Sequence, residues 1–149
     1  MRLNRAAEYG VRCVLYMSLK GKDEVVRRRD IAQGMKIPAA FLGKVAQQLA
    51  RAGIIEILQG AKGGYRLLAS PENITLLDVV ETFIGEIFLN DCIMNPESCF
   101  RSPNCGVNRV WQEARNQLRE TLKRATFSAL MEESTCARPF DPFGNPKGK

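Results

Sequence analysis

The sequence contains no histidine and no Cys-x-x-Cys pair. Without an imidazole, the chain has no histidine ligand for a metal and no histidine base to activate a cysteine nucleophile. Without a Cys-x-x-Cys pair, it also lacks the usual zinc knuckle and the usual dithiol of a redox enzyme. A metal site in this chain must therefore be built mainly from separated cysteine thiolates and oxygen ligands.

Long apolar runs are missing as well. No stretch approaches the roughly 18 to 20 apolar residues that span a membrane, and the opening Met1–Arg5 lacks the apolar core of a signal peptide. We therefore expect a cytoplasmic protein with no membrane partner. In that compartment thiols are normally kept reduced, so clustered cysteines indicate a metal or redox site more readily than a disulfide framework.

The charge of the chain is unevenly divided. The 149 residues are 45% hydrophobic, enough for one domain, or for a small domain with an oligomerisation arm, and the net charge is +6. Residues 1–70 hold thirteen Lys and Arg against five Asp and Glu, whereas residues 71–149 hold nine against eleven. A basic half before a nearly neutral remainder is typical of a protein that places one face on a polyanion, most often nucleic acid.

The N-terminal half has the pattern of three helices followed by a hairpin. Apolar residues at helical spacing predict helices over residues 5–19, 28–35 and 38–52. Residues 54–58 and 65–69 predict two short strands, and the glycine-rich stretch between them predicts a hairpin tip. This order predicts a mainly α fold with a small β wing. It is a winged helix-turn-helix, whose third helix suits a major groove and whose hairpin suits a minor groove or phosphates.

The third predicted helix has one apolar face and other faces rich in hydrogen-bond donors. The donors are Lys44, Gln47, Gln48 and Arg51, and the hairpin tip adds Lys62. Such side chains suit contacts with DNA phosphates and base edges. The alternative is an ordinary solvated face of an amphipathic helix. The basic excess of this half favours DNA.

The C-terminal half predicts two further helices. Thr75 and Asp78 have the form of a capping box that begins a helix running to about Phe88. A longer helix is predicted from Val107 to about Met131, with apolar residues every three or four positions. No second long helix is evident to cover this stripe, so pairing with a second copy is the economical explanation, and a dimer suits a palindromic DNA site. The alternative is that the stripe packs on the chain's own winged domain.

Between these two helices, the stretch Asp91–Cys105 holds three of the five cysteines. Six residues separate Cys92 from Cys99 and five separate Cys99 from Cys105, with two prolines and short polar residues between them. From such a loop, three thiolates can converge on a soft metal or an iron–sulfur cluster, and a fourth ligand is left open.

The predicted organisation has three parts. Residues 1–70 form a winged helix-turn-helix DNA-binding domain, residues 71–131 hold the cluster-binding loop and dimerisation helices, and residues 132–149 form a Pro- and Gly-containing tail that is expected to be disordered.

This order of elements and several local strings resemble the Rrf-two family of bacterial winged-helix transcription regulators, which includes IscR-like and NsrR-like iron–sulfur sensors. The likeness covers about residues 1–131. It rests on Met1-Arg2-Leu3, Tyr9, Ile31-Ala32, Phe41-Leu42-Gly43-Lys44-Val45 through Leu49, Gly63-Gly64-Tyr65-Arg66-Leu67 and the three cysteines. The resemblance implies a homodimeric regulator of promoter DNA, not an enzyme. The affinity of this regulator for DNA would depend on an iron–sulfur cluster, 4Fe–4S or 2Fe–2S, and we expect the regulator to act as a repressor.

The resemblance also implies ligands for that cluster. By position, Cys92, Cys99 and Cys105 correspond to the three thiolate ligands. IscR-like members complete the site with a histidine three residues after the last cysteine, where this chain has Asn108, an amide that binds iron poorly.

NsrR-like members instead use an acidic residue on the first helix of the partner subunit, and the matching position here is Glu8. The alternative for Glu8 is a solvated carboxylate favoured by the helix dipole. Cys136 is a second candidate for the fourth ligand, although it has no family counterpart. Cys13 lies among apolar helix residues and is expected to be a small buried side chain.

For DNA, the resemblance points to the second and third helices and the wing. The candidate contacts are Arg28, Arg29, Lys44, Gln47, Gln48, Arg51, Gln59, Lys62 and Arg66. Many members carry an arginine at the start of the wing, where Gln59 stands, and IscR-like members carry Glu where Gly43 stands. We therefore expect the recognised operator to differ.

Two other interpretations remain open from the sequence. The cysteines are also compatible with a structural zinc site in a constitutive or differently regulated DNA-binding protein, since three thiolates and a carboxylate suit zinc. A thiol redox enzyme is the third interpretation, and the missing histidine and Cys-x-x-Cys pair weigh against it.

Overall fold

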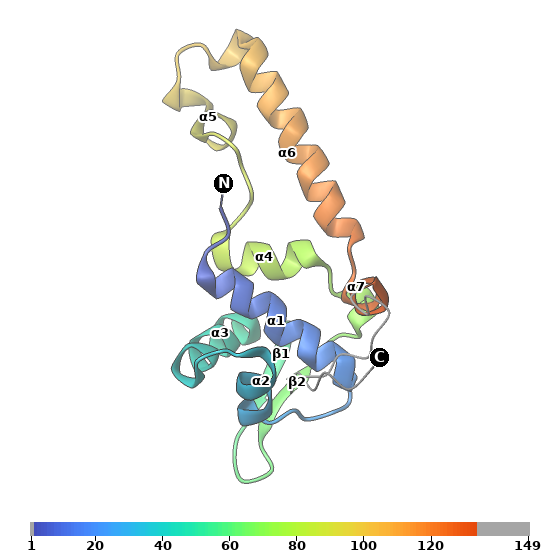
Figure 1. The fold of residues 1–149 in the computed structure, drawn as a ribbon. Coiled ribbons are helices and arrows are strands. Elements are labelled where there is room, and N and C mark those ends of the chain that lie inside the picture. Colours follow the sequence, from blue (N-terminus) through green and yellow to red (C-terminus); the bar gives the residue numbers. More distant parts are fainter. Residues whose placement is uncertain (1, 134–149) are drawn as a thin grey trace.

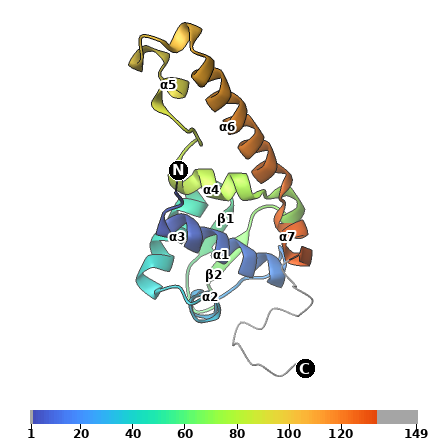
Figure 2. The ribbon, with the colours of Figure 1, turned by 45° about the horizontal axis from the view of Figure 1, so that its top comes forward.

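The structure, a computed structural model, describes residues 2–133 as a helical lobe from which one long helix extends as an arm (Figure 1). The lobe contains helices α1 (Arg5–Lys20), α2 (Arg28–Met35), α3 (Ala39–Arg51), α4 (Leu76–Ile84) and α7 (Phe127–Glu133), and strands β1 (Ile55–Leu58) and β2 (Gly64–Leu67). The arm is α6 (Gly106–Arg124), and the short helix α5 (Asp91–Met94) lies near its far end (Figure 2). Three 3-10 turns, Pro71–Asn73, Pro96–Ser98 and Ser102–Asn104, complete the described structure.

The winged helix-turn-helix is confirmed. Helix α1 begins where the Asn4 side chain accepts a hydrogen bond from the Ala7 N–H at 2.8 Å, and it ends before Gly21. Strands β1 and β2 are antiparallel, and Ile55 pairs with Leu67. Val26, just before α2, extends this sheet by exchanging two 2.9 Å backbone hydrogen bonds with Tyr65. The hairpin is thereby anchored against the start of α2.

One core joins most of the lobe. Met17 of α1, Leu42 and Leu49 of α3 and Ile55 of β1 are almost completely buried in the same cluster. This cluster also takes in Val79 of α4 and the start of α7, so the apolar core continues past residue 70.

Helix α4 is shorter than its sequence pattern suggested. Its start is the predicted capping box, in which the Asp78 N–H donates to the Thr75 hydroxyl and the Thr75 N–H donates to the Asp78 carboxylate. The predicted end near Phe88 is wrong, because the helix stops at Ile84. Gly85 has φ +76, which glycine adopts without steric cost, and Ile87 then folds back so that its N–H donates to Glu81 Oε1 at 3.0 Å.

The prediction of one continuous helix from Val107 to Met131 is also wrong. Helix α6 ends at Arg124, and Ala125 has extended φ and ψ. The Leu76 N–H donates to the Ala125 carbonyl at 2.8 Å, and the Phe127 N–H donates to the Ile74 carbonyl at 2.9 Å. These two backbone bonds take the chain out of the helix and bring Phe127, which is fully buried, into the core.

The apolar stripe of α6 divides between two environments. Leu118 and Leu122 pack on the cluster formed by Leu77 and Val80 of α4 with Ile87. This part of the stripe therefore packs within the chain, on α4 rather than mainly on the predicted winged domain of residues 1–70. The start of the same helix is uncovered in the chain. There the exposed fractions are 57% for Val107, 60% for Val110 and 37% for Trp111. Among the described residues, this second part of the stripe is the part that stays open to a partner.

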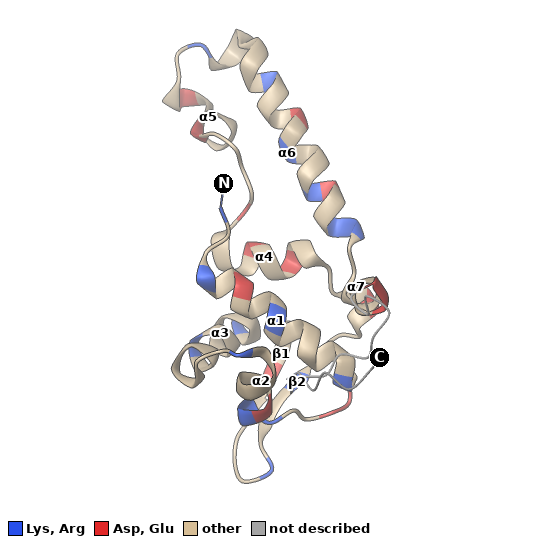
Figure 3. Cartoon of the chain, viewed as in Figure 1, with Lys and Arg blue, Asp and Glu red and all other residues tan. Residues whose placement is uncertain are grey.

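Charged residues lie along both α4 and α6 (Figure 3), and ion pairs hold the arm to the lobe. Arg119 of α6 donates to both carboxylate oxygens of Glu81 on α4, at 2.8 and 3.0 Å. Arg115 donates to the Ile87 carbonyl at 2.7 Å and pairs with Glu86. Burial alone raises the pKa of Glu81, but hydrogen bonds from Arg119 and the Ile87 N–H, with the charges of Arg119 and Arg115, outweigh it and hold the pKa below its usual value.

This pair makes a prediction about stability and pH. At pH 7, Arg119→Met is expected to lower the free energy of unfolding by about 1–2 kcal/mol, because Glu81 loses its charged partner. Since the folded pKa of Glu81 is depressed, the stabilisation is complete above its unfolded pKa and is lost as the pH falls through the folded value. A double-mutant cycle with Glu81→Gln, followed by urea unfolding at pH 7 and pH 3, measures the coupling. Coupling of equal size at both pH values would contradict the assignment.

Within residues 2–133, every helix is too short or too polar to cross a bilayer.

Candidate DNA-binding surface and cysteine site

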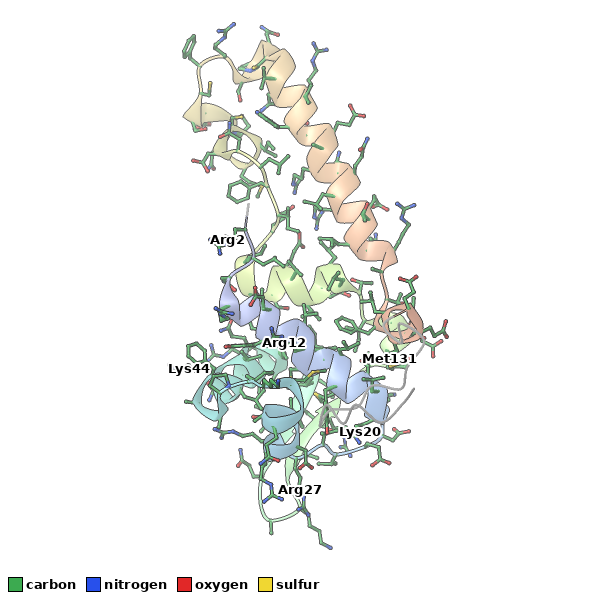
Figure 4. The ribbon with its side chains drawn as sticks, in the orientation of Figure 1. Arg2, Arg12, Lys20, Arg27, Lys44 and Met131 are labelled. Carbon is green, nitrogen blue, oxygen red and sulfur yellow. The ribbon has the colours of Figure 1, made fainter. Side chains whose placement is uncertain are left out.

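The predicted DNA-contacting residues lie on α2, α3 and the hairpin. Arg28 and Arg29 begin α2, and both are exposed. On α3, Lys44, Gln47 and Arg51 are exposed and Gln48 is half-buried, while Leu42, Val45 and Leu49 face the core. Figure 4 shows Lys44 on the lobe, far from the cysteine segment at the end of the arm. The helix therefore keeps its donor-rich side available to solvent.

The hairpin supplies a second row of groups beside α3. A groove of about 360 Å³ separates the two, lined by Arg28, Gly43 and Gln47 on the helical side and by Gln59 and Gly60 on the hairpin side. Exposed Lys62 stands at the tip. The structure thus brings three of the predicted contacts, Arg28, Gln47 and Gln59, to one groove.

Two of the predicted arginines already have partners in the protein. Arg28 donates to the Ala39 carbonyl at 2.8 Å, which ties the start of α2 to the start of α3. Arg66 on β2 pairs across the hairpin with Glu56 on β1. A phosphate contact by Arg66 would have to compete with that carboxylate, whereas Lys44 and Lys62 have ends exposed to solvent.

The cysteine segment is a series of short turns rather than an unstructured loop. Cys92 is in α5, whose N-cap is the Asn90 side chain, Cys99 follows the turn Pro96–Ser98, and Cys105 is the N-cap residue of α6. All three thiols are free and half-buried. Pro96 is the first residue and Pro103 the second residue of two tight turns, and the segment doubles back on itself and returns to the start of the arm.

Cys92 and Cys105 line the same pocket, which has a volume of about 480 Å³. Asn108, in the first turn of α6, lines the same pocket. Its Nδ2 donates to the carbonyl and to Sγ of Cys92, both at 3.2 Å, and its Oδ1 accepts from Gln112 Nε2 at 2.6 Å. Cys99 is not in the lining of this pocket.

The donor set suits an iron–sulfur cluster, but the described structure assembles only part of it. Three free thiols on one short segment are the ligands that such clusters use. Within residues 2–133, however, no three side chains of Cys, Asp or Glu lie close enough together to hold one metal ion. Two thiols share a pocket, so ligation by all three requires the turns around Cys99 to move toward it.

Glu8 lies elsewhere in the same chain. It is in the first turn of α1, pairs with Arg5 at 3.3 Å, and borders a groove of about 490 Å³ between α1, α4 and α6. The rest of that groove is mainly apolar, with Val11, Val80 and Leu118 among its lining residues. Cys136, the other candidate for the fourth ligand, lies outside the described residues, as does most of the predicted tail.

Burial distinguishes Cys13 from these thiols, as expected. Cys13 is completely buried in the core of the lobe, and this burial raises the pKa of its thiol to about 12. A thiol that stays protonated at neutral pH is a poor metal ligand.

The sequence indicated Asn108 only as the residue that stands where IscR-like members have histidine, and it gave no signal for Ser102. The Ser102 hydroxyl donates to the Cys92 carbonyl at 3.4 Å. The partners of Asn108 and Ser102 are sixteen and ten positions away, and nothing in the spacing of the sequence indicated these bonds.

Comparison with known proteins identifies the family. The model of the Rrf2 family, described as "Iron-dependent Transcriptional regulator", matches residues 3–133. The chain belongs to the Rrf2 family. This is the Rrf-two resemblance seen in the sequence, and it makes the protein a transcriptional regulator rather than an enzyme.

Several relatives of this Rrf2 protein are similar over most of their length. Protein aau3 of Rhizobium meliloti is 33% identical over 93% of this chain and 88% of its own. The HTH-type transcriptional regulator NsrR of Bacillus licheniformis is 28% identical over 88% of this chain and 92% of its own.

Solved structures agree with the fold. A transcriptional regulator from Listeria innocua superposes with a TM-score of 0.74 at 29% identity, covering 95% of this chain and 93% of its own. CymR, the global cysteine regulator of B. subtilis, superposes with the same TM-score of 0.74 at 22% identity, covering 89% of this chain and 98% of its own. IscR of T. potens gives 0.73 at 18% identity, covering 95% of this chain and 93% of its own. At these last two identities the likeness shows the winged-helix fold alone.

Proposed function

We propose that this Rrf2 protein is a homodimeric repressor whose affinity for promoter DNA depends on an iron–sulfur cluster held by Cys92, Cys99 and Cys105. The observation that carries the proposal is the pocket shared by Cys92 and Cys105 at the start of α6. The two free thiols lie at the far end of the arm, and ion pairs hold this arm to the winged lobe. A ligand bound at the thiols is therefore linked through the arm to the DNA-binding surface. The family description as iron-dependent and the relatives named NsrR support the same function.

The proposed dimer uses the uncovered start of α6. Val107, Val110 and Trp111 form an exposed apolar stretch beside the cysteine segment, and burying such a stretch against a second copy removes apolar surface from water. In this arrangement, Glu8 of the partner subunit is the proposed fourth ligand, since the same chain places Glu8 away from the cysteines.

When bound, the cluster supplies a redox-active group whose loss or oxidation frees its ligands. Freed cysteine residues leave the segment 91–105 held by hydrogen bonds alone, including those that Asn108 of α6 donates to Cys92. That segment continues from residues 85–87, which Glu81, Arg115 and Arg119 hold between α4 and α6. Helix α4 in turn packs on α1 of the winged lobe. A coupling of about 1–3 kcal/mol along this path changes DNA affinity by about 5- to 150-fold.

Cys99→Ala tests the proposal. Wild-type protein purified without air is expected to be coloured and to contain iron and acid-labile sulfide, whereas the variant is expected to lack the visible absorption, because two thiolates and a carboxylate hold a cluster poorly. The matched control is Cys13→Ala, which removes a thiol that is buried in the lobe and should keep the colour. An unchanged spectrum in Cys99→Ala would rule out Cys99 as an essential ligand.

Metal analysis of the same samples decides between two functions. Iron with sulfide supports the cluster. Zinc alone, without sulfide, would instead support a structural zinc site in a DNA-binding protein that is constitutive or regulated by other means.

A further inference from the structure

Asn108 is one of two buried polar residues in the described part of the chain, with 6% of its surface exposed. A buried amide is costly unless all its polar groups are bonded, and an apolar side chain of similar size would fill the same space without that cost. The bonds that Asn108 makes therefore indicate why an amide stands there.

Both ends of the Asn108 amide are occupied. Nδ2 faces the Cys92 carbonyl and the Cys92 sulfur at 3.2 Å each, with the Ser102 hydroxyl at 3.5 Å. A carbonyl oxygen only accepts hydrogen bonds, so the NH₂ group must be the end of the amide that faces Cys92. Oδ1 accepts from Gln112, one turn further along α6, and this bond holds the side chain in that orientation.

These bonds hold Cys92, one proposed ligand, against α6, the helix that begins after Cys105, another proposed ligand. Cys92 receives hydrogen bonds from Asn108 and Ser102 on its carbonyl, and from Asn108 on its sulfur. Cys105 is the N-cap residue of the helix that carries Asn108 three residues later. Asn108 therefore keeps the two thiols on the same pocket, although they are thirteen residues apart in the sequence.

We infer that Asn108 is a positioning residue, which fixes Cys92 beside Cys105 and donates an N–H···S hydrogen bond to the Cys92 sulfur that raises the reduction potential of a cluster bound there. This inference rests on the proposed function. An N–H donor stabilises sulfur most when the cluster is reduced and more negative, so its removal makes the potential more negative. Outer-shell partners of this kind typically change metal affinity by about 10- to 100-fold.

Asn108→Asp is the principal test. The variant keeps the size of the side chain and an oxygen facing Gln112, and an acidic residue in the first turn of α6 favours the helix. It removes the N–H donors and places a negative charge beside the Cys92 sulfur. Asn108→Leu is the second variant, which removes the donors without adding charge. Asn116→Asp is the matched control, because Asn116 is exposed further along α6 and does not line the pocket of Cys92 and Cys105.

The first readout needs no cluster. In cluster-free, reduced protein, hydrogen–deuterium exchange in residues 91–95 is expected to rise at least about tenfold in both Asn108 variants. Exchange in these residues should stay at the wild-type level in Asn116→Asp, and exchange in α3 should be unchanged in all three variants. Equal exchange in wild type and both Asn108 variants would overturn the positioning role.

The second readout uses protein purified without air. Asn108→Leu, which adds no new ligand, is expected to have a more negative midpoint potential and to lose iron to a chelator about 10- to 100-fold faster than wild type and Asn116→Asp. Unchanged potential and unchanged iron loss would overturn the inference and leave the proposed function standing. Wild-type protein without iron and sulfide would overturn the proposed function itself, and that result is obtained before any variant is made.

Discussion

Phe127→Ala is expected to lower the free energy of unfolding by about 3–5 kcal/mol. Phe127 is fully buried in the core of the lobe, so truncating its ring leaves a cavity and removes apolar contacts. The Phe127 N–H, which donates to the Ile74 carbonyl at 2.9 Å, is unchanged by this substitution, so the measured loss reports the side chain. Urea unfolding of cluster-free, reduced protein, followed by circular dichroism, provides the measurement.

The matched control for Phe127 is Phe100→Ala. The same atoms are removed, but Phe100 in the cysteine segment is 94% exposed, so its unfolding free energy should stay within about 0.5 kcal/mol of wild type. If the two variants unfold at the same urea concentration, α7 does not pack in the core as described.

Lys44→Ala is expected to weaken DNA binding strongly and without regard to sequence. Each lost phosphate contact makes the slope of log K against log salt concentration shallower by about 0.9, which corresponds to about eightfold in affinity at 0.1 M salt. In the proposed dimer the contact is lost twice, so the expected loss is roughly 60-fold at that salt concentration. Titrations between 0.05 and about 0.3 M salt, on duplexes that wild-type protein selects from a random library, measure both quantities.

Lys123→Ala controls for net charge in this experiment. Lys123 is exposed in the last turn of α6, and its removal changes the charge by the same amount as Lys44→Ala but away from α3. Affinity and salt slope should stay near their wild-type values. If Lys123→Ala and Lys44→Ala weaken binding equally, the effect comes from overall charge and α3 is not the contacting surface.

Local chemistry explains why much of the lobe was predictable from sequence. The bounds of α2 agree with its apolar spacing, because a short amphipathic helix is defined by its own buried residues, Ile31 and Met35. The capping box at Thr75 and Asp78 lies within four residues, so its two reciprocal bonds are visible in the sequence. The glycine-rich hairpin tip is likewise a local signal.

The helix ends were not predictable in the same way. Ala125 and Ala129 continue the apolar repeat of α6, and no glycine or proline lies nearby to oppose a continuous helix. The break is made by hydrogen bonds to Ile74 and Leu76, about fifty positions earlier in the chain. A periodic pattern reports which residues are apolar, but it does not report which other segment competes for their backbone groups.

The winged helix-turn-helix, the basic excess of the N-terminal half and the family could all be predicted from the sequence, because they follow from local spacing, composition and short motifs. The packed structure was needed to show that the stripe of α6 is covered at Leu118 and Leu122 but open at Val107 and Trp111. It also decided that Asn108, which the sequence presents as an absent histidine, bonds to Cys92. Both outcomes depend on contacts between residues far apart in the chain, and such contacts exist only once the elements have packed together.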